Sequence, residues 1–419
     1  MLQNRPYEQG LSQNKLQFIL LVLVNAFVGG MVGLERVILP EFAKSSFGIN
    51  ATFAIMSFVM AFGISKAVSN YSVAKLTKKY SRKTILIGGW LFAIPVPFIL
   101  MYAPSWNWVI FANILLGIHQ GISWSTTVIM KIDLVGSKNR GLAMGINEFA
   151  GYLSVGLASY LSSSIAATYG YHVFPFIPGI IFVFMGLMIS ILLIKDTTHF
   201  VHEESRFSNV AILKNVWLDT SLRHKNISTV SVNGLINNMN DAVVWVLLPM
   251  LLINRGFSII QIGVIAGIYP SVWGLSQLFT GKLGDRFCKK QMITLGMLMQ
   301  SVSIVVLAFS SNWELLIIAS ILLGLGTGLV YPNFLTVIAE NSHPTQRSET
   351  LSIFRFWRDS GYVIGALFAS FLSSQIGLVY TIFVMGIITG AAGFYAHFRM
   401  CCTLKKWWKD SECTTIPAY

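Results

Sequence analysis

A short basic segment separates two long apolar runs at residues 70–86. It carries five cations, Lys75, Lys78, Lys79, Arg82 and Lys83. Cationic side chains are costly in hydrocarbon, so we expect a hairpin that joins two membrane helices. A second basic segment, at residues 281–292, has the same character. Because basic loops gather on the cytoplasmic side of membrane proteins, both hairpins are predicted to be cytoplasmic.

The rest of the chain divides into about twelve apolar runs. Of the 419 residues, 54% are hydrophobic and 11% are charged, whereas soluble domains carry roughly 25% charged residues. A membrane helix needs about 20 largely apolar residues, and its backbone has to satisfy its own hydrogen bonds. We therefore expect an all-α integral membrane protein with twelve transmembrane helices. The runs lie at residues 16–40, 51–74, 84–103, 106–130, 141–166, 173–195, 227–254, 257–281, 290–311, 313–337, 350–373 and 377–400.

The net charge of +13 is distributed unevenly along the chain. Cations gather in alternate loops, and the opposite loops hold little beyond Lys44 and Arg255. This asymmetry predicts that both termini are cytoplasmic. Anionic lipid headgroups, rather than nucleic acid, are the expected counter-charge. The chain is predicted to be a multi-pass protein of the plasma membrane, which is the inner membrane in a bacterium.

The two halves of the chain share landmarks at an almost constant offset. Trp106 and Trp313 are 207 positions apart (313 − 106), and so are Arg140 and Arg347 (347 − 140). A parallel duplication of six helices predicts two pseudo-symmetric bundles, related by an axis along the membrane normal. The expected parts are a tail at 1–15, a bundle at 16–195, a cytoplasmic loop at 196–226, a bundle at 227–400 and a tail at 401–419.

The basic hairpins and the loops after the fourth run of each half carry a family motif. The second-half hairpin fits the pattern G-x-L-a-D-R-x-G-R-K, with Cys288 in place of the second glycine, at Gly281, Leu283, Asp285, Arg286, Lys289 and Lys290. The first-half copy departs from it at Ala74, Lys78 and Ser81. Asp133 with Arg140, and Glu340 with Arg347, fit a second family pattern, D-x(n)-R-G. Over nearly all of its length the chain resembles the major facilitator superfamily of transporters.

The resemblance implies a gate on the cytoplasmic side. In the family, the aspartate of the hairpin docks near a helix N-terminus of the opposite half, where free N–H groups and the helix dipole favour an anion. Asp285 is expected to dock near Gly141. Lys78 replaces the aspartate in the first half, and it either pairs with Glu349 or leaves that latch loosened. The predicted gate residues are Lys78, Arg82, Asp133, Arg140, Asp285, Arg286, Glu340, Arg347 and Glu349.

Polar and ionisable side chains within membrane helices are costly, so each is a functional candidate. Glu35 is expected either to titrate or to form a static ion pair with Lys66. His119 is expected either to relay protons or to be a packing residue. The predicted substrate or proton pathway consists of Glu35, Arg36, Lys66, His119, Gln120, Trp124, Glu148, Asn237, Asn238, Asp241, Tyr331, Arg355, Arg358 and Asp359.

The eleventh run carries three of these candidates. Arg355 and Asp359 are four residues apart, so they are predicted to pair on one helix face. Arg358 would then be left for the substrate or for Glu148 in the other half. Two arginines at this depth favour recognition of an anion by planar donors. An ion-pair gate is the alternative.

These features predict a secondary active transporter that works by alternating access. No G-x-x-x-x-G-K-[ST] nucleotide motif occurs, so we expect protons to drive it through Glu35, Asp241 or Glu148. The basic side chains favour a small polar or anionic organic solute. The alternatives are efflux of amphipathic drug-like compounds, movement of a lipid, or a receptor on the same fold. We expect a monomer without cofactor, metal, nucleic acid or enzymatic activity.

Overall fold

The structure is a computed structural model, and it describes residues 10–135, 140–200 and 212–401. The regular elements in these residues are helices. Those of the first half are α1 (Lys15–Arg36), α2 (Leu39–Phe47), α3 (Thr52–Lys79), α4 (Arg82–Ala93), α5 (Pro95–Met101), α6 (Trp106–Val135), α7 (Arg140–Tyr169), η1 (Phe174–Phe176) and α8 (Ile177–Leu192). Those between the halves are η2 (Thr198–Phe200), α10 (Val216–Leu218) and η4 (Asp219–Arg223). Those of the second half are α11 (Lys225–Ala242), η5 (Val243–Leu247), α12 (Leu248–Asn254), α13 (Ile259–Arg286), α14 (Lys289–Phe309), α15 (Trp313–Asn341) and α16 (Pro344–Arg399).

Several of the predicted membrane-spanning segments consist of more than one helix in the structure, and one helix, α16, contains two such segments. Proline lacks the N–H that continues a helix, and α4 gives way to α5 at Pro95. The 56-residue α16 bends at Gly377, whose φ of 78° is readily adopted only by glycine. Within the described ranges, nine helices are long and apolar enough to cross a membrane. With the second crossing of α16 and the 30-residue helices α6 and α7, the predicted fold of twelve transmembrane helices is confirmed.

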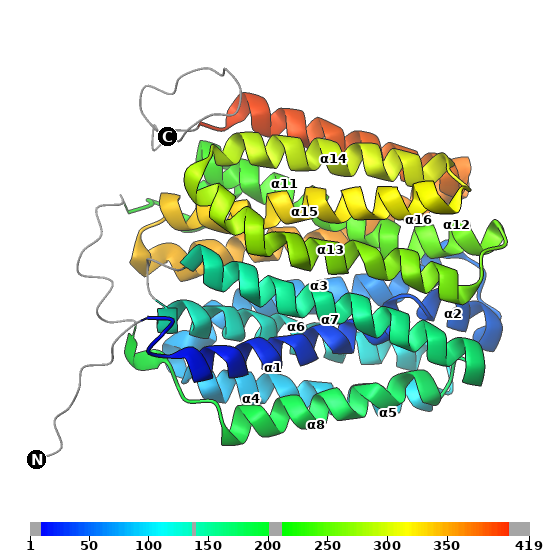
Figure 1. Ribbon diagram of the computed structural model, residues 1–419, viewed down its shortest axis with the longest axis horizontal. Helices are drawn as coiled ribbons and strands as arrows, with labels where there is room; N and C mark the ends of the chain where they lie inside the picture. Colours follow the sequence, from blue (N-terminus) through cyan, green and yellow to red (C-terminus); the bar gives the residue numbers. More distant parts are fainter. Residues whose placement is uncertain (1–9, 136–139, 201–211, 402–419) are drawn as a thin grey trace, which may run out of the picture.

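The two halves pack side by side, with α1 to α8 in the lower part of Figure 1 and α11 to α16 in the upper part. They meet along α7 with α13 and along α3 with α16. Small residues allow the first pair to approach closely. A Cβ atom on Gly156 would lie 2.5 Å from the carbonyl oxygen of Gly267. Any larger residue at position 156 would therefore push α7 and α13 apart.

The two ends of the molecule differ in charge. At the right-hand end in Figure 1, α2 contacts α12 across the halves. We call this the outer end, because the charge pattern predicts that it faces the outside. The inner end carries the basic connections from α3 to α4 and from α13 to α14.

Equivalent ion pairs occur at the inner end of each half. Arg82 Nε donates to Asp133 Oδ2 at 2.8 Å, and Lys289 Nζ lies 2.8 Å from Glu340 Oε1. The two cations are 207 positions apart in the sequence (289 − 82), and so are the two carboxylates (340 − 133). The two bundles therefore repeat this contact in space, as a duplicated six-helix unit predicts. The residue boundaries given above for the domains remain predictions.

Candidate central binding site

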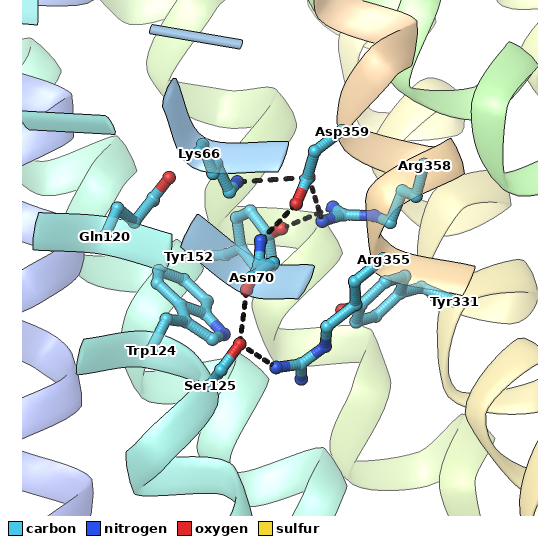
Figure 2. A pocket seen from close by; sticks show the side chains of 10 residues that line it. All are labelled: Lys66, Asn70, Gln120, Trp124, Ser125, Tyr152, Tyr331, Arg355, Arg358 and Asp359. Carbon is cyan, nitrogen blue, oxygen red and sulfur yellow. Dashed lines mark hydrogen bonds and ion pairs between the residues drawn. The ribbon is translucent and has the colours of Figure 1, made fainter. Parts of the chain in front are cut away.

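A narrow pocket lies between the two halves (Figure 2), and the residues that line it from α3, α6 and α7 fall near the middle of those helices. Its lining comes from α3, α6, α7, α15 and α16. The lining residues are Lys66, Asn70, Gln120, Trp124, Ser125, Tyr152, Tyr331, Arg355, Arg358 and Asp359. The cavity volume is about 10 Å³, which is room for about one water molecule. An organic solute can therefore enter only after the halves move apart.

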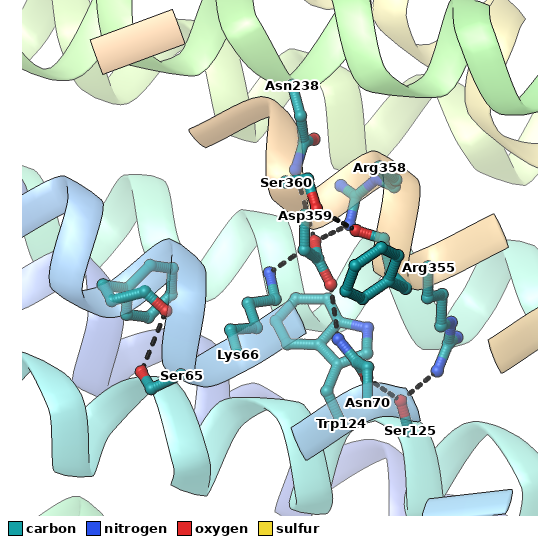
Figure 3. Close-up of polar contacts among 12 residues, drawn as sticks. Ser65, Lys66, Asn70, Trp124, Ser125, Asn238, Arg355, Arg358, Asp359 and Ser360 are labelled. Atoms are coloured by element: carbon teal, nitrogen blue, oxygen red, sulfur yellow. Dashed lines mark hydrogen bonds and ion pairs between the residues drawn. The ribbon is translucent and has the colours of Figure 1, made fainter. Parts of the chain in front are cut away.

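Asp359 is the centre of the polar contacts in this pocket (Figure 3). Its Oδ1 lies 3.4 Å from Lys66 Nζ and 3.2 Å from Arg358 Nη1. Asn238 Nδ2 donates to the same oxygen at 3.2 Å, and Asn70 donates to Oδ2. Because Lys66 and Asn70 belong to α3, this one carboxylate joins the two halves.

Arg355 does not pair with Asp359, so that prediction was wrong. Its Nη1 instead donates to Ser125 of α6, and Ser125 donates to Asn70. The reason is that Asp359 is already surrounded by Arg358 and by the polar residues of α3, whereas Ser125 faces Arg355 across the interface. The structure thus links α16 to α6 through a neutral hydroxyl.

Arg358 lies between the charged side of the pocket and an aromatic side. Its Nη2 donates to the Tyr152 hydroxyl at 2.9 Å, and its guanidinium carbon lies 4.5 Å from the ring centre of Tyr331. Tyr152 of α7 stacks on Trp273 of α13 with ring centres 3.5 Å apart. The ring centres of Trp124 and Tyr152 are 5.1 Å apart. The aromatic side is therefore built by both halves.

Three of the predicted pathway residues are buried carboxylates that lie outside the Asp359 cluster. Glu148 accepts hydrogen bonds from Trp124 Nε1 at 2.9 Å and from Asn147 Nδ2 at 2.8 Å. Asp241 accepts one from the Tyr269 hydroxyl at 3.0 Å. Glu35 accepts one from Asn113 at 3.0 Å and lies 3.9 Å from Arg36.

Two proposed pairings are absent among the described contacts. The static pair of Glu35 with Lys66 is not formed, because Lys66 extends toward Asp359 instead. Arg358 does not bond to Glu148, because the Tyr152 hydroxyl and Asp359 take its Nη atoms.

The remaining pathway candidates are divided between the pocket and the protein interior. Gln120 lines the pocket. His119 faces away from it: its Nδ1 lies 3.0 Å from the Gly89 carbonyl oxygen and its ring packs 4.5 Å from Trp90. That geometry favours the packing alternative. Asn237 is fully buried, and its amide has no hydrogen-bond partner in the described residues.

The gate residues are only partly described. Arg82 with Asp133 and Glu340 with Lys289 form the repeated ion pairs given above. Arg286 is exposed, and Arg347 and Glu349 are half-buried. The side chains of Lys78, Arg140 and Asp285 lie outside the described part of the structure. The docking of Asp285 and the exchange of charges between Lys78 and Glu349 therefore remain predictions.

Sequence reasoning missed three residues of the central pocket. Asn70, Ser125 and Tyr152 link Asp359, Arg355 and Arg358 to the first half. Asn70 gave a usable signal, because it lies one helical turn after Lys66 on α3. Ser125 and Tyr152 gave none, since hydroxyl groups are common in membrane helices.

Comparisons with known proteins agree with this architecture. The sequence model of the Major Facilitator Superfamily matches residues 20–226 and 230–401. The proton-coupled antiporter flippase LtaA of Staphylococcus haemolyticus is 26% identical over 374 residues, covering 87% of this chain and 88% of the relative. The multidrug resistance protein MdtH of Salmonella choleraesuis is 30% identical over 143 residues, covering 33% of this chain and 36% of the relative.

A solved structure shows the same fold. The human organic anion transporter MFSD10 superposes with a TM-score of 0.70 at 12% identity, covering 91% of this chain and 99% of that one. At this identity the likeness concerns the fold alone. With the family match over both halves, the chain belongs to the Major Facilitator Superfamily and is a multi-pass membrane transporter.

Proposed function

We propose that this transporter moves a small polar or anionic organic solute by alternating access. The observation that carries the proposal is the excess of cations in the central pocket. Lys66, Arg355 and Arg358 line it together with a single carboxylate, Asp359. Within the described residues, Arg355 Nη2 and Arg358 Nε have no hydrogen-bond partner. A carboxylate or phosphate of the solute would accept from these planar donors.

We further propose that protons drive the transport. Glu35, Glu148 and Asp241 are fully buried, and each has one oxygen without a hydrogen-bond partner among the described residues. Carboxylates in membrane helices are typical of proton relays. The similarity to LtaA, which is named a proton-coupled antiporter, supports the same coupling here.

Uptake into proteoliposomes under an imposed pH gradient tests the proposal. The panel would contain organic anions, neutral polar solutes and lipophilic cations. We expect uptake of an organic anion that is lost in Arg358→Gln. The matched control is Arg223→Gln, which removes the same charge from an exposed position on η4 and should transport normally. Uptake of lipophilic cations alone would contradict the proposal and favour drug efflux.

The second candidate function is the movement of an amphipathic lipid between leaflets. It is favoured by the similarity to the flippase LtaA, which extends over 87% of this chain. The cationic side of the pocket suits the polar headgroup of a lipid, and the aromatic side suits the apolar part next to the headgroup. In the same vesicles, a fluorescent lipid analogue and an impermeant quencher would report flipping. Flipping without uptake of any soluble anion would select this candidate.

We also propose that the transporter is a monomer of the plasma membrane with both termini in the cytoplasm. The basic loops at the inner end support this orientation. Reporter fusions to each terminus test it, because both should be active only with a reporter that works in the cytoplasm. A periplasmic or extracellular signal from either fusion would overturn the proposed orientation.

A further inference from the structure

A further buried cation lies apart from the central pocket, and its donors have no hydrogen-bond acceptor among the described residues. Arg36, near the outer end of α1, is fully buried. In the described structure its Nε, Nη1 and Nη2 atoms all lack a hydrogen-bond partner. The nearest carboxylate oxygen, from Glu35, is 3.9 Å away, which is too far for a hydrogen bond. A guanidinium has five N–H donors, and burying them unpaired is costly.

Aromatic rings enclose this guanidinium. Its central carbon lies 4.0 Å from the ring centre of Phe62, 5.1 Å from Trp245 and 5.6 Å from Phe58. Rings attract a cation through their faces, but they accept no in-plane hydrogen bond. The donors that point along the guanidinium plane are therefore left for an oxyanion, which pairs with them in bidentate fashion.

The aromatic enclosure closes only when the two halves meet. Phe58 and Phe62 belong to α3, whereas Trp245 belongs to η5 of the other half. The π-helical turn η5 brings Trp245 over Arg36, and Trp245 also stacks on Tyr362 with ring centres 5.7 Å apart. Such turns occur frequently at functional sites. Separation of the halves at the outer end would remove Trp245 and uncover Arg36.

Two rings connect Arg36 to the central pocket. Phe62 and Tyr362, one from each half, meet edge to face with ring centres 5.4 Å apart. Lys66 Nζ lies 5.4 Å from the Phe62 ring centre and 5.0 Å from that of Tyr362. Phe62 therefore contacts both cations, and Lys66 is already part of the Asp359 cluster. Arg36, Lys66, Arg358 and Arg355 form a series of cations from the outer end toward the inner end.

We propose that Arg36 is an outer binding site for the anionic group of the substrate, separated from the central pocket by the Phe62–Tyr362 ring pair. The inference rests on the proposed function and extends it to a two-site path. In the outward-open state a carboxylate or phosphate binds to Arg36. The ring pair then has to separate before the anion reaches Lys66 and Arg358.

The thermal stability of the purified protein separates a ligand site from a structural arginine. Arg36 lies 3.9 Å from Glu35, and its N–H groups lack acceptors in the described structure. Replacing both members of such a buried pair by uncharged side chains is often neutral or stabilising. The double variant combines Arg36→Met with Glu35→Gln, which removes the adjacent carboxylate charge. It should raise Tm by about 2 °C or more. The control is Arg255→Met at the same end, since Arg255 donates to the carbonyl oxygens of Ala308 and Ser310 at 2.6 Å. Arg255→Met should lower Tm. A similar fall in Tm in the double variant Arg36→Met with Glu35→Gln would overturn the proposal.

Benzoate, a small carboxylate, provides the binding probe. It should raise the Tm of the wild type and of Arg36→Lys, and the rise should be at least halved in Arg36→Met. An equal rise in Arg36→Met would overturn the outer site while leaving the anion proposal intact. Absence of a rise in the wild type, together with no anion uptake, would overturn the proposed function itself.

Thiol labelling tests the ring pair as a barrier. Arg36→Cys and Lys66→Cys would each be made with the four native cysteines replaced by serine. An impermeant reagent added at the outer side should label Cys at position 36. It should label Cys at position 66 about tenfold faster when Tyr362→Ala is also present than when it is absent, a factor equivalent to about 1.4 kcal/mol. Equal labelling of position 66 with and without Tyr362→Ala would overturn the barrier. No labelling of position 36 from outside would overturn the outer site.

Discussion

At the scale of single residues, Asp359 determines whether the cations of the central pocket are tolerated. Asp359→Asn would leave Lys66 and Arg358 buried without a counter-charge. Breaking a buried ion pair by removing one partner typically costs about 3–5 kcal/mol. We expect a loss of that order in the free energy of unfolding, measured by denaturant titration in detergent.

The control for this variant is Glu314→Gln, which removes a carboxylate charge from an exposed position on α15. A surface change of this kind should alter stability by less than about 0.5 kcal/mol. Equal stability of Asp359→Asn and Glu314→Gln would show that the pocket cations do not depend on Asp359.

The sequence predicted which charges would matter, but not how they pair. Lys66, Arg358 and Asp359 are recognisable because an ionisable group in a membrane helix is costly, and all three line the central pocket. The pairing of Arg355 was predicted from helix spacing alone and was wrong. Its actual partner, Ser125, is 230 positions away. Only the way in which the two halves meet decides that contact, and no local pattern encodes it.

At the scale of elements, α10 and η4 close the inner end of the interface. Trp217 of α10 lies 5.6 Å from Tyr71 of α3 and 5.5 Å from Phe356 of α16, measured between ring centres. Trp357 Nε1 also donates to Ser221 Oγ of η4 at 2.8 Å. One indole therefore bridges the two halves, although it belongs to the connection between them.

Trp217→Ala should loosen this closure. Trp217 also lies 6.2 Å from Trp357, between ring centres. Each aromatic pair contributes about 0.5–1.5 kcal/mol beyond its buried area, so losing these three pairs predicts roughly tenfold or more opening at the inner end. The readout is the labelling rate of Gln120→Cys in the central pocket, with the thiol reagent added to inverted vesicles. Leu222→Ala, at an exposed apolar residue of η4, is the control. An unchanged rate in Trp217→Ala would show that the connection does not restrain opening.

Close packing of α7 and α13 depends on glycine at position 156. In Gly156→Leu the side chain would meet the backbone of Gly267, and overpacking costs typically about 1–3 kcal/mol. We expect a lower Tm and loss of transport. Gly88→Leu on α4 is the matched control, because a Cβ there meets nothing within 4 Å. Equal behaviour of the two variants would contradict the role of this contact.

Element types were easier to predict than element boundaries. Long apolar runs can form only helices in lipid, which predicted α3, α13 and α14 directly. The runs at 350–373 and 377–400 predicted two helices with a break at residues 374–376. The structure places the non-helical residue of α16 at Gly377, which was predicted as the first residue of the second helix. The π-helical turn η5 could not be predicted at all, since its residues Val243–Leu247 are apolar and have no distinctive spacing.

At the scale of the whole molecule, the duplicated sequence places different chemistry at equivalent positions. Trp124 and Tyr331 are 207 positions apart (331 − 124), and both line the central pocket. Glu148 and Arg355 have the same offset (355 − 148), so a carboxylate in one half corresponds to a cation in the other. The fold is repeated, but at these two positions the charge is not. Unlike side chains at equivalent positions allow a carrier to hold its proton and its anion on different residues.

Separate handling of proton and solute predicts that transport can be uncoupled. A gradient of one pH unit stores about 1.36 kcal/mol per proton, so one coupled proton supports at most about tenfold accumulation of solute. Neutralising the coupling carboxylate should abolish accumulation but preserve exchange of solute at equilibrium. We expect this result in one of the variants Glu35→Gln, Glu148→Gln and Asp241→Asn. Because each isosteric amide retains most of the hydrogen-bonding geometry, counterflow in proteoliposomes should persist in that variant. Accumulation equal to the wild type in all three would exclude them as the coupling site.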